Sequence, residues 1–324
     1  MKTVLIVTRT FGKYTSEPID LLKNNGFDLL WSDSLNPDLL RRADAIILGT
    51  GKLTGEMIEN SSLKIIARHG VGVDNVDLKK ATDLGIPVTI TPNANTVSVA
   101  ELVIGLIFVL SRRLVDVHNE LFEKRKFSSS VGIEVLGKTL GVIGFGAIGR
   151  ETAKRGLCLG MRVLAYDPYV SREVIHQYSV EQVDLETLLK TSDFVSLHLP
   201  LNQTTRKMIG KREIQMMKKT AFLINTSRGG IVDENALVEA LKENQIAGAA
   251  FDAFEVEPLP EDSVLYNCPK LILTPHIGAH TYEAIYRMNM MASQAVVDFF
   301  NKKLPQHIVN VEIVDRLLKQ GFSH

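Results

Sequence analysis

Three side chains suited to anion binding or proton transfer follow hydrophobic runs in the second half of the sequence. Arg228 comes after the run 221–225, and its guanidinium can grip a carboxylate or carbonyl oxygen through two parallel hydrogen bonds. His276 comes after the run 271–274, and an imidazole is suited to general acid or base catalysis near neutral pH. Glu257 lies between them, and a carboxylate beside an imidazole raises the pKa of the imidazole and fixes its tautomer. The set predicts a site that binds an anion and moves a proton.

Each of these residues, taken alone, also has a structural interpretation. A single arginine or histidine at a strand end more often stabilises a fold than takes part in catalysis, but three in order at successive strand ends favour catalysis. The other histidines are weaker candidates. His276 and His280 lack the H-E-x-x-H pattern and a third ligand, so no metal is expected. His198 lies within a strand and is interpreted as a packed or cofactor-adjacent residue.

A glycine-rich turn at 144–149 reads G-F-G-A-I-G, directly after a hydrophobic run at 140–143 and before a helical segment at 147–160. Such glycines permit a tight turn and let the backbone approach a pyrophosphate, which then lies at the helix N-terminus. Asp167 ends the next strand, about 20 residues further on, where a ribose hydroxyl needs an acceptor. Since a carboxylate repels the 2′-phosphate of NADP, the pair predicts NAD. The structural alternative is that the glycines only pack a helix on a strand.

A second glycine pattern, at 132–139, matches the phosphate-binding motif G-x-x-x-x-G-K-[ST]. A working motif of this kind follows a strand and opens a helix. This one follows a serine-rich break and runs into the strand at 140, so we reject it.

Composition limits the classes of protein that the chain could belong to. Its 324 residues are enough for roughly two domains, and 45% hydrophobic with 23% charged residues is typical of a globular protein. Lys plus Arg and Asp plus Glu both equal 37, which disfavours nucleic acid and anionic membranes as partners. The two cysteines form no disulfide framework. The first residues lack a signal-peptide cleavage site, and the longest apolar stretch is too short to span a bilayer. We expect a cytoplasmic protein.

Short Val/Ile/Leu-rich runs alternate with amphipathic segments along the whole chain, as in βα units that feed parallel sheets. Long helices are expected at about 97–113 and 281–303, and the one long irregular loop, 255–270, is a candidate functional loop. Two series of strands are expected, at 4–8, 27–31, 45–49, 64–68 and 87–90, and at 140–143, 162–166, 194–199, 221–225, 248–251 and 271–274.

Taken together, these motifs resemble those of the D-isomer-specific 2-hydroxyacid dehydrogenases, and most closely those of phosphoglycerate dehydrogenase-like members without a regulatory tail. Five segments in the right order carry the resemblance: 68–77, 91–101, 144–149, 225–233 and 274–279.

The resemblance implies a role for each matching residue. Arg228, Glu257 and His276 correspond to the catalytic Arg, Glu and His of the family. The substrate side corresponds to Arg68, Asn95 and the backbone amides around Val71 and Gly72. Positions that match NAD contacts are Gly144, Gly146, Ala147, Ile148, Gly149, Asp167, Leu199, Thr226, Ser227, Asp252 and Gly278.

The resemblance also implies an α/β architecture of two doubly wound parallel-sheet domains, with a Rossmann NAD domain (98–287) inserted into a flavodoxin-like substrate domain (1–97 and 288–324). Family members of this kind form homodimers through the inserted domain. The two long helices are natural crossings between such domains.

The expected activity is reversible hydride transfer between NAD and a D-2-hydroxyacid, with 3-phosphoglycerate, and hence serine biosynthesis, as the first candidate. One departure bears on it: the family's phosphate-binding arginine after the third strand is Leu48 here, so that Arg68 and Lys52 would have to supply the charge. A hydroxypyruvate, glyoxylate or general 2-ketoacid reductase is the alternative. A non-catalytic NADH-binding corepressor-like module is the rival from another class, and Glu257 disfavours formate dehydrogenases, which have glutamine there.

Overall fold

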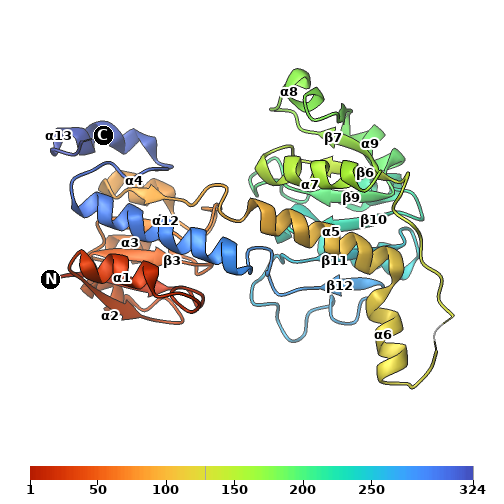
Figure 1. Ribbon diagram of the computed structural model, residues 1–324, viewed down its shortest axis with the longest axis horizontal. Coiled ribbons are helices and arrows are strands. Elements are labelled where there is room, and N and C mark those ends of the chain that lie inside the picture. Colours follow the sequence, from red (N-terminus) through yellow and green to blue (C-terminus); the bar gives the residue numbers. More distant parts are fainter. Residues whose placement is uncertain (128, 324) are drawn as a thin grey trace. The chain divides into compact units, whose positions relative to one another are not determined.

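The computed structural model describes residues 1–127 and 129–323, which divide into two compact units. One unit contains Met1–Asn95 and His280–His324, and the other contains Thr96–Ala279 (Figure 1). We infer that they are the predicted substrate and NAD domains. The second boundary falls after residue 279 rather than 287, because helix α12 (Tyr282–Phe300) packs along its whole length in the first unit.

The first unit has a five-stranded parallel sheet with the order β2-β1-β3-β4-β5. Its central strands consist of aliphatic residues that are buried on both faces, as expected when helices cover a parallel sheet on both sides. The strands are β1 (Lys2–Val7), β2 (Phe27–Trp31), β3 (Ala45–Leu48), β4 (Ile65–Arg68) and β5 (Val88–Thr89).

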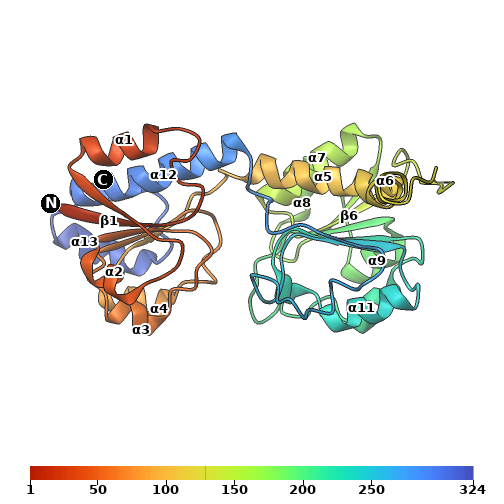
Figure 2. The same ribbon diagram turned by 90° about the horizontal axis from the view of Figure 1, so that it is seen from below.

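Helices α1 (Glu17–Asn24) and α12 cover one face of this sheet, and α2 (Pro37–Arg42), α3 (Gly55–Glu59) and α4 (Leu78–Leu84) cover the other (Figure 2). The segment after α12, for which the sequence predicted no helix or strand, forms a 3-10 turn (Val311–Ile313) and helix α13 (Val314–Lys319). Ile313, Leu317 and Phe322 bury their side chains beside Phe299, which explains why this segment is structured.

The second unit has a seven-stranded parallel sheet with the order β12-β11-β10-β9-β6-β7-β8. The sequence did not predict β8, a polar two-residue edge strand. The strands are β6 (Thr139–Ile143), β7 (Arg162–Tyr166), β8 (Glu181–Gln182), β9 (Phe194–Leu197), β10 (Phe222–Asn225), β11 (Gly248–Phe251) and β12 (Leu271–Leu273).

Helices again cover both faces of the second sheet (Figure 2). A 3-10 turn, η1 (Gly229–Ile231), follows β10. One face carries α5 (Thr96–Arg112), α7 (Ala147–Cys158) and α8 (Arg172–His176); the other carries α9 (Leu185–Thr191), α10 (Lys211–Met216) and α11 (Glu234–Lys242). Helix α6 (Leu114–Phe122) follows α5 and buries none of its residues.

Both sheets are parallel, so the loops after their strands gather at one edge of each sheet, where open α/β sheets bind ligands. In the described part of the chain, no helix is long and apolar enough to cross a membrane.

Candidate active site

Apart from Glu257, which lies in the long loop between β11 and β12, the predicted catalytic and cofactor residues of the second unit lie just after a strand or in the first turn of the helix that follows it. Along the carboxyl edge of the sheet they come from six adjacent strands, so the topology gathers residues that are far apart in sequence. In sheet order they are His276 and Gly278 after β12, Asp252 after β11, Thr226, Ser227 and Arg228 after β10, Leu199 after β9, Gly144, Gly146, Ala147, Ile148 and Gly149 after β6, and Asp167 after β7.

The glycine-rich turn between β6 and α7 contains two glycines in close contact with the backbone and one that is open to solvent. Gly144 has φ +92°, and a Cβ on it would lie 2.6 Å from the carbonyl oxygen of His198. A Cβ on Gly149 would lie 2.1 Å from the carbonyl oxygen of Gly144. Gly146, at the N-cap of α7, is exposed, and its Cβ would meet nothing within 4 Å. The open position therefore fits the close approach of a pyrophosphate to a helix N-terminus.

Asp167 lies against this turn. Its Oδ2 accepts a hydrogen bond from the Phe145 amide at 2.8 Å, and its Oδ1 accepts one from the Tyr169 amide at 2.9 Å. Each carboxylate oxygen retains acceptor capacity for a ribose hydroxyl. The Oγ1 of Thr226 is buried and has no hydrogen-bond partner among the described residues. This turn and the orphaned hydroxyl fit NAD.

Glu257 and His276 form a charged pair after β11 and β12, at one end of the sheet. Glu257 Oε2 lies 2.7 Å from His276 Nδ1, and Glu257 Oε1 accepts a hydrogen bond from the Phe254 amide at 3.0 Å. The hydrogen bond to Glu257 raises the pKa of His276, despite partial burial and the nearby charge of Arg228. Burial alone would raise the pKa of Glu257, but the hydrogen bond and charge of His276 lower it overall. The pair thus favours a cationic imidazole beside a carboxylate.

The turn that carries His276 is shaped by Asp252, which is 1% exposed. Asp252 Oδ1 accepts from Thr274 Oγ1 at 2.6 Å and from the Ile277 amide at 2.8 Å, and Oδ2 accepts from the Gly278 amide at 2.8 Å. His276 itself has φ +53°, a left-handed conformation that is uncommon for a residue with a side chain. The structure therefore shows Asp252 organising this turn, and burial raises its pKa.

Arg228 is held by a residue that the sequence analysis did not select. Asn225 is fully buried; its Nδ2 donates to the Arg228 carbonyl at 2.8 Å, and its Oδ1 accepts from the Ser227 amide at 3.1 Å. The signal in the sequence was a polar residue at the buried end of an aliphatic strand. The next residue, Gly229, packs against the loop after β11, where a Cβ would lie 1.8 Å from the carbonyl carbon of Phe254.

The predicted substrate residues lie in the first unit, and Arg68 differs from the expectation. Its side chain is 6% exposed, its Nε donates to the Gly72 carbonyl at 2.9 Å, and its Nη1 donates to the carbonyls of Leu48 and Gly49. The guanidinium therefore shapes the loops after β3 and β4. Val71 is 41% exposed, Gly72 is half-buried, and Asn95 Oδ1 is buried without a hydrogen-bond partner among the described residues.

Two further histidines are unsuited to donate a proton in catalysis. Burial lowers the pKa of His198 to about 3 and, together with weaker effects, that of His69 to about 4, so both are neutral at neutral pH. Within residues 1–127 and 129–323, no group of His, Cys, Asp and Glu side chains is arranged to hold a metal ion.

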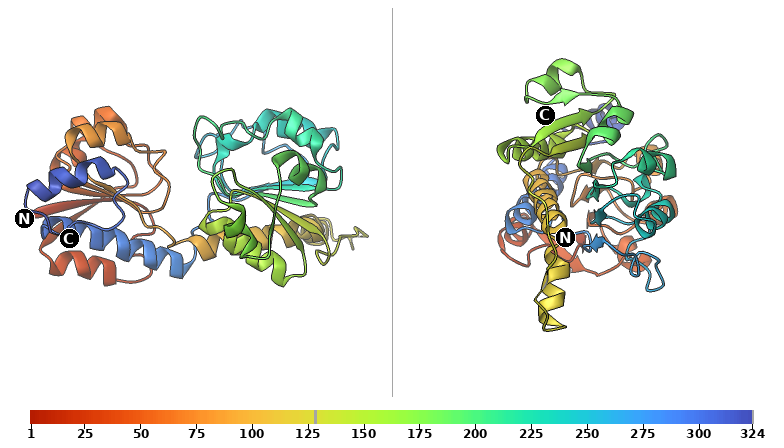
Figure 3. Two further views of the ribbon diagram at one scale, coloured as in Figure 1. Left: turned by 90° about the horizontal axis from the view of Figure 1, so that it is seen from above. Right: turned by 90° about the vertical axis from the view of Figure 1, so that its right-hand side faces the viewer.

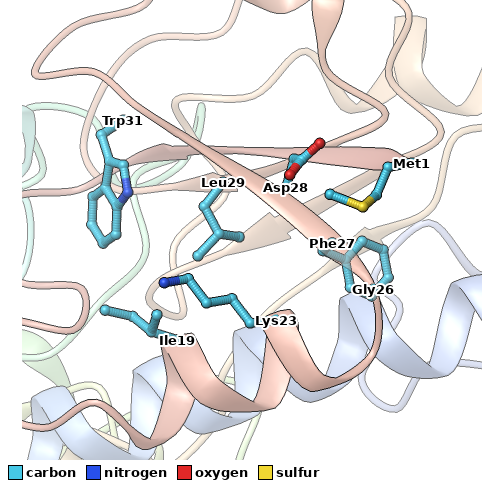
Figure 4. A pocket seen from close by; sticks show the side chains of 8 residues that line it. All are labelled: Met1, Ile19, Lys23, Gly26, Phe27, Asp28, Leu29 and Trp31. Atoms are coloured by element: carbon cyan, nitrogen blue, oxygen red, sulfur yellow. The ribbon is translucent and has the colours of Figure 1, made fainter.

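A surface hollow of about 650 Å³ lies between α1 and the edge strand β2 (Figure 4). Ile19 and Lys23 line it from the helix, and Leu29 and Trp31 line it from the strand. It contains none of the predicted site residues, so we do not assign the site to it.

Comparison with known proteins identifies the family of this chain. The family model for the D-isomer specific 2-hydroxyacid dehydrogenase NAD-binding domain matches residues 104–278. The chain is 42% identical over 279 residues to a D-3-phosphoglycerate dehydrogenase of Methanocaldococcus jannaschii, covering 84% of this chain and 52% of that protein, which is thus about twice as long as the matched part.

Two other relatives match over nearly their whole length. A glyoxylate reductase of Thermococcus litoralis is 40% identical over 301 residues, covering 88% of this chain and 91% of the relative. The solved structure of a D-lactate dehydrogenase from Aquifex aeolicus with NAD and lactic acid has a TM-score of 0.83 at 30% identity, covering 97% of this chain and 98% of the other. The chain belongs to the family of D-isomer specific 2-hydroxyacid dehydrogenases, and it is an NAD-dependent oxidoreductase with the two-sheet α/β fold and the cofactor that its sequence predicted.

Proposed function

We propose that Arg228, Glu257 and His276 interconvert a D-2-hydroxyacid and its 2-ketoacid. Arg228 binds the carboxylate and polarises the 2-oxygen through its guanidinium. His276 donates a proton to that oxygen during reduction and takes it back during oxidation. Glu257 keeps His276 cationic until the proton is transferred. When bound at the turn after β6, the cofactor would supply the hydride as NADH for reduction or accept it as NAD+ for oxidation.

The observation that carries this proposal is the 2.7 Å contact between Glu257 Oε2 and His276 Nδ1. Because Nδ1 is occupied by the carboxylate, Nε2 is the ring nitrogen left to face a substrate, and it has no hydrogen bond to a described residue. This is how a carboxylate orients an imidazole for acid and base work.

For the substrate, we infer 3-phosphoglycerate and its ketoacid phosphohydroxypyruvate, by analogy with the phosphoglycerate dehydrogenase relative. Reduction of glyoxylate or unphosphorylated hydroxypyruvate is the second candidate. It is supported by Leu48, which is fully buried, and by Arg68, whose guanidinium is committed to backbone carbonyls, since neither offers an obvious phosphate ligand.

The purified protein is expected to oxidise NADH when given phosphohydroxypyruvate, with a rate that declines as the pH rises. The sign follows from His276: reduction needs its protonated form, which is lost as the pH rises through its raised pKa, whereas oxidation of the hydroxyacid needs the neutral form and accelerates over the same range. Initial rates in both directions from pH 5 to pH 10, with hydroxypyruvate measured in parallel, test this.

Glu257→Gln is the matched control for that profile. Its amide oxygen can still accept from Nδ1, but the negative charge is gone, so the pKa of His276 falls and the decline in reduction moves to lower pH. An unchanged profile would contradict the role given to Glu257. Intact NADH binding without turnover of any ketoacid would contradict the proposed function and favour the corepressor-like alternative.

We further propose that the protein is a homodimer that associates through α6 and the chain following it. Helix α6 projects from the rest of its unit (Figures 1 and 3), and a row of apolar side chains here is at least one-third exposed. These are Leu114, Val115, Leu121, Phe122, Phe127, Val131, Ile133 and Leu136. Such a surface is unusual for a monomer and is typical of an interface. A dimer mass by light scattering, reduced to a monomer mass by Leu121→Asp with Phe122→Asp, is expected; a wild-type monomer would contradict the proposal.

A further inference from the structure

The loops after β1, β3 and β4 meet at the ligand-binding edge of the first unit's sheet. Strands β1 and β3 pair with Val7 opposite Leu48, and β3 and β4 pair with Leu48 opposite Arg68. Three adjacent strands therefore end at the same level. The chain after β4 continues into the loop 70–76, which contains the predicted carboxylate-binding amides.

The loop after β3 is fastened to loop 70–76 on both sides of Lys52. The Nδ2 of Asn75 donates to the Gly51 carbonyl at 2.7 Å and to the Gly49 carbonyl at 3.1 Å. The Leu53 amide donates to the Asn75 carbonyl at 2.8 Å. Lys52 is thus held next to Asn75, between two pinned neighbours, while its own side chain is exposed.

The loop after β1, which carries Arg9, lies against the loop after β3. The Gly49 amide donates to the Val7 carbonyl at 2.8 Å, and a Cβ on Gly49 would lie 3.1 Å from Cβ of Thr8. Phe11 is 3% exposed and packs its ring 5.9 Å from that of Trp31, which anchors the loop. Arg9 is exposed on this anchored loop.

Neither Arg9 nor Lys52 has a hydrogen-bond or ion-pair partner for its side chain among the residues that the structure describes. Some other exposed lysines of this unit do, since Lys64 pairs with Asp44 and Lys79 with Asp83. Free cations at a ligand-binding edge differ from a charge-balanced surface, because their field there is not neutralised by a neighbour.

We propose that Arg9 and Lys52 bind an anionic group at the far end of the ketoacid, a phosphate or a second carboxylate, and so set the substrate class. This inference rests on the proposed function. Arg9 offers a bidentate fork and Lys52 a point charge, a combination suited to either anion. They supply the charge that Leu48 lacks and that Arg68 directs to backbone carbonyls.

The test compares Arg9→Met, Lys52→Met and the double variant with the wild type on three ketoacids: phosphohydroxypyruvate, oxaloacetate and unphosphorylated hydroxypyruvate. Each single change is expected to lower kcat/KM for the preferred anionic ketoacid about tenfold, as for the loss of one charged hydrogen bond, mainly through KM. The values for hydroxypyruvate stay within about twofold, since that substrate lacks the anion. Preference between phosphohydroxypyruvate and oxaloacetate decides between phosphate and carboxylate.

Lys23→Met is the matched control, because Lys23 is an exposed lysine of the same unit at the end of α1, where the helix has run back toward the opposite edge of the sheet. It is expected to leave all three values unchanged. Equal losses on every ketoacid, or no loss on any, would overturn the inference while leaving the proposed function standing. Absence of turnover on all ketoacids by the wild type would overturn both.

Discussion

His276→Ala is expected to lower kcat for ketoacid reduction about 10³-fold, within the range usual for loss of a general acid. In the proposed reaction the imidazole that Glu257 holds through Nδ1 protonates the 2-oxygen, and water would replace it poorly. NADH affinity is expected to remain within about twofold, because the turn at 144–149 and Asp167 lie on other strands. Steady-state NADH oxidation gives kcat, and NADH fluorescence titration gives the affinity.

The control for this change is His176→Ala, which removes an exposed histidine from the last turn of α8. It is expected to retain wild-type kcat. Near-normal turnover by His276→Ala would rule out His276 as the acid. A loss of NADH binding together with turnover would instead indicate damage to the cofactor region.

Gly229→Ala is expected to have the second-largest effect, and it acts on stability as well as on turnover. The added methyl would lie 1.8 Å from the Phe254 carbonyl carbon and 2.2 Å from the Glu255 amide nitrogen, so the backbone must move. Overpacking of this kind costs about 3 kcal/mol. Because Gly229 follows Arg228 and presses on the loop that leads to Glu257, the same movement misplaces both site residues. The urea midpoint and kcat/KM are expected to fall together.

Gly230→Ala tests whether the effect is specific to position 229. A Cβ on Gly230 would lie 3.4 Å from the side chain of Leu201 and 3.5 Å from that of Arg206, both within ordinary contact distance. We expect this neighbour to be nearly neutral in stability and activity. If the two alanine variants behave alike, the close approach at Gly229 does not position the site.

The carboxyl-edge location of the site could be predicted from sequence because it depends on short local patterns. Most site residues, with Glu257 as the exception, follow an aliphatic run, and parallel pairing brings the ends of such runs to one edge whatever the strand order. The glycine turn at 144–149 can also be recognised in the sequence, because the conformation of Gly144 and the close packing of Gly149 require glycine at these positions. The family, the two-sheet fold and NAD were therefore predicted and confirmed.

Other features depended on contacts between distant segments. β8 is a polar two-residue strand that exists only because β7 pairs with it, and α13 forms where its apolar residues meet Phe299. The domain boundary moved from 287 to 279 because packing holds the whole of α12 in the first unit.

Residue types and their spacing by themselves determined the fold class, the cofactor and which side chains could do chemistry, since these follow from local periodicity and from the few residues that a tight turn or a proton transfer tolerates. Only the tertiary structure decided where the polar groups point. The Arg68 guanidinium binds three backbone carbonyls, and Asn225 and Asp252 organise the turns that hold Arg228 and His276. Arg9 and Lys52 have no side-chain partner among the described residues. The reason is physical: a buried polar group must find its hydrogen bonds among whichever segments the fold brings near, and the sequence does not show which segments those are.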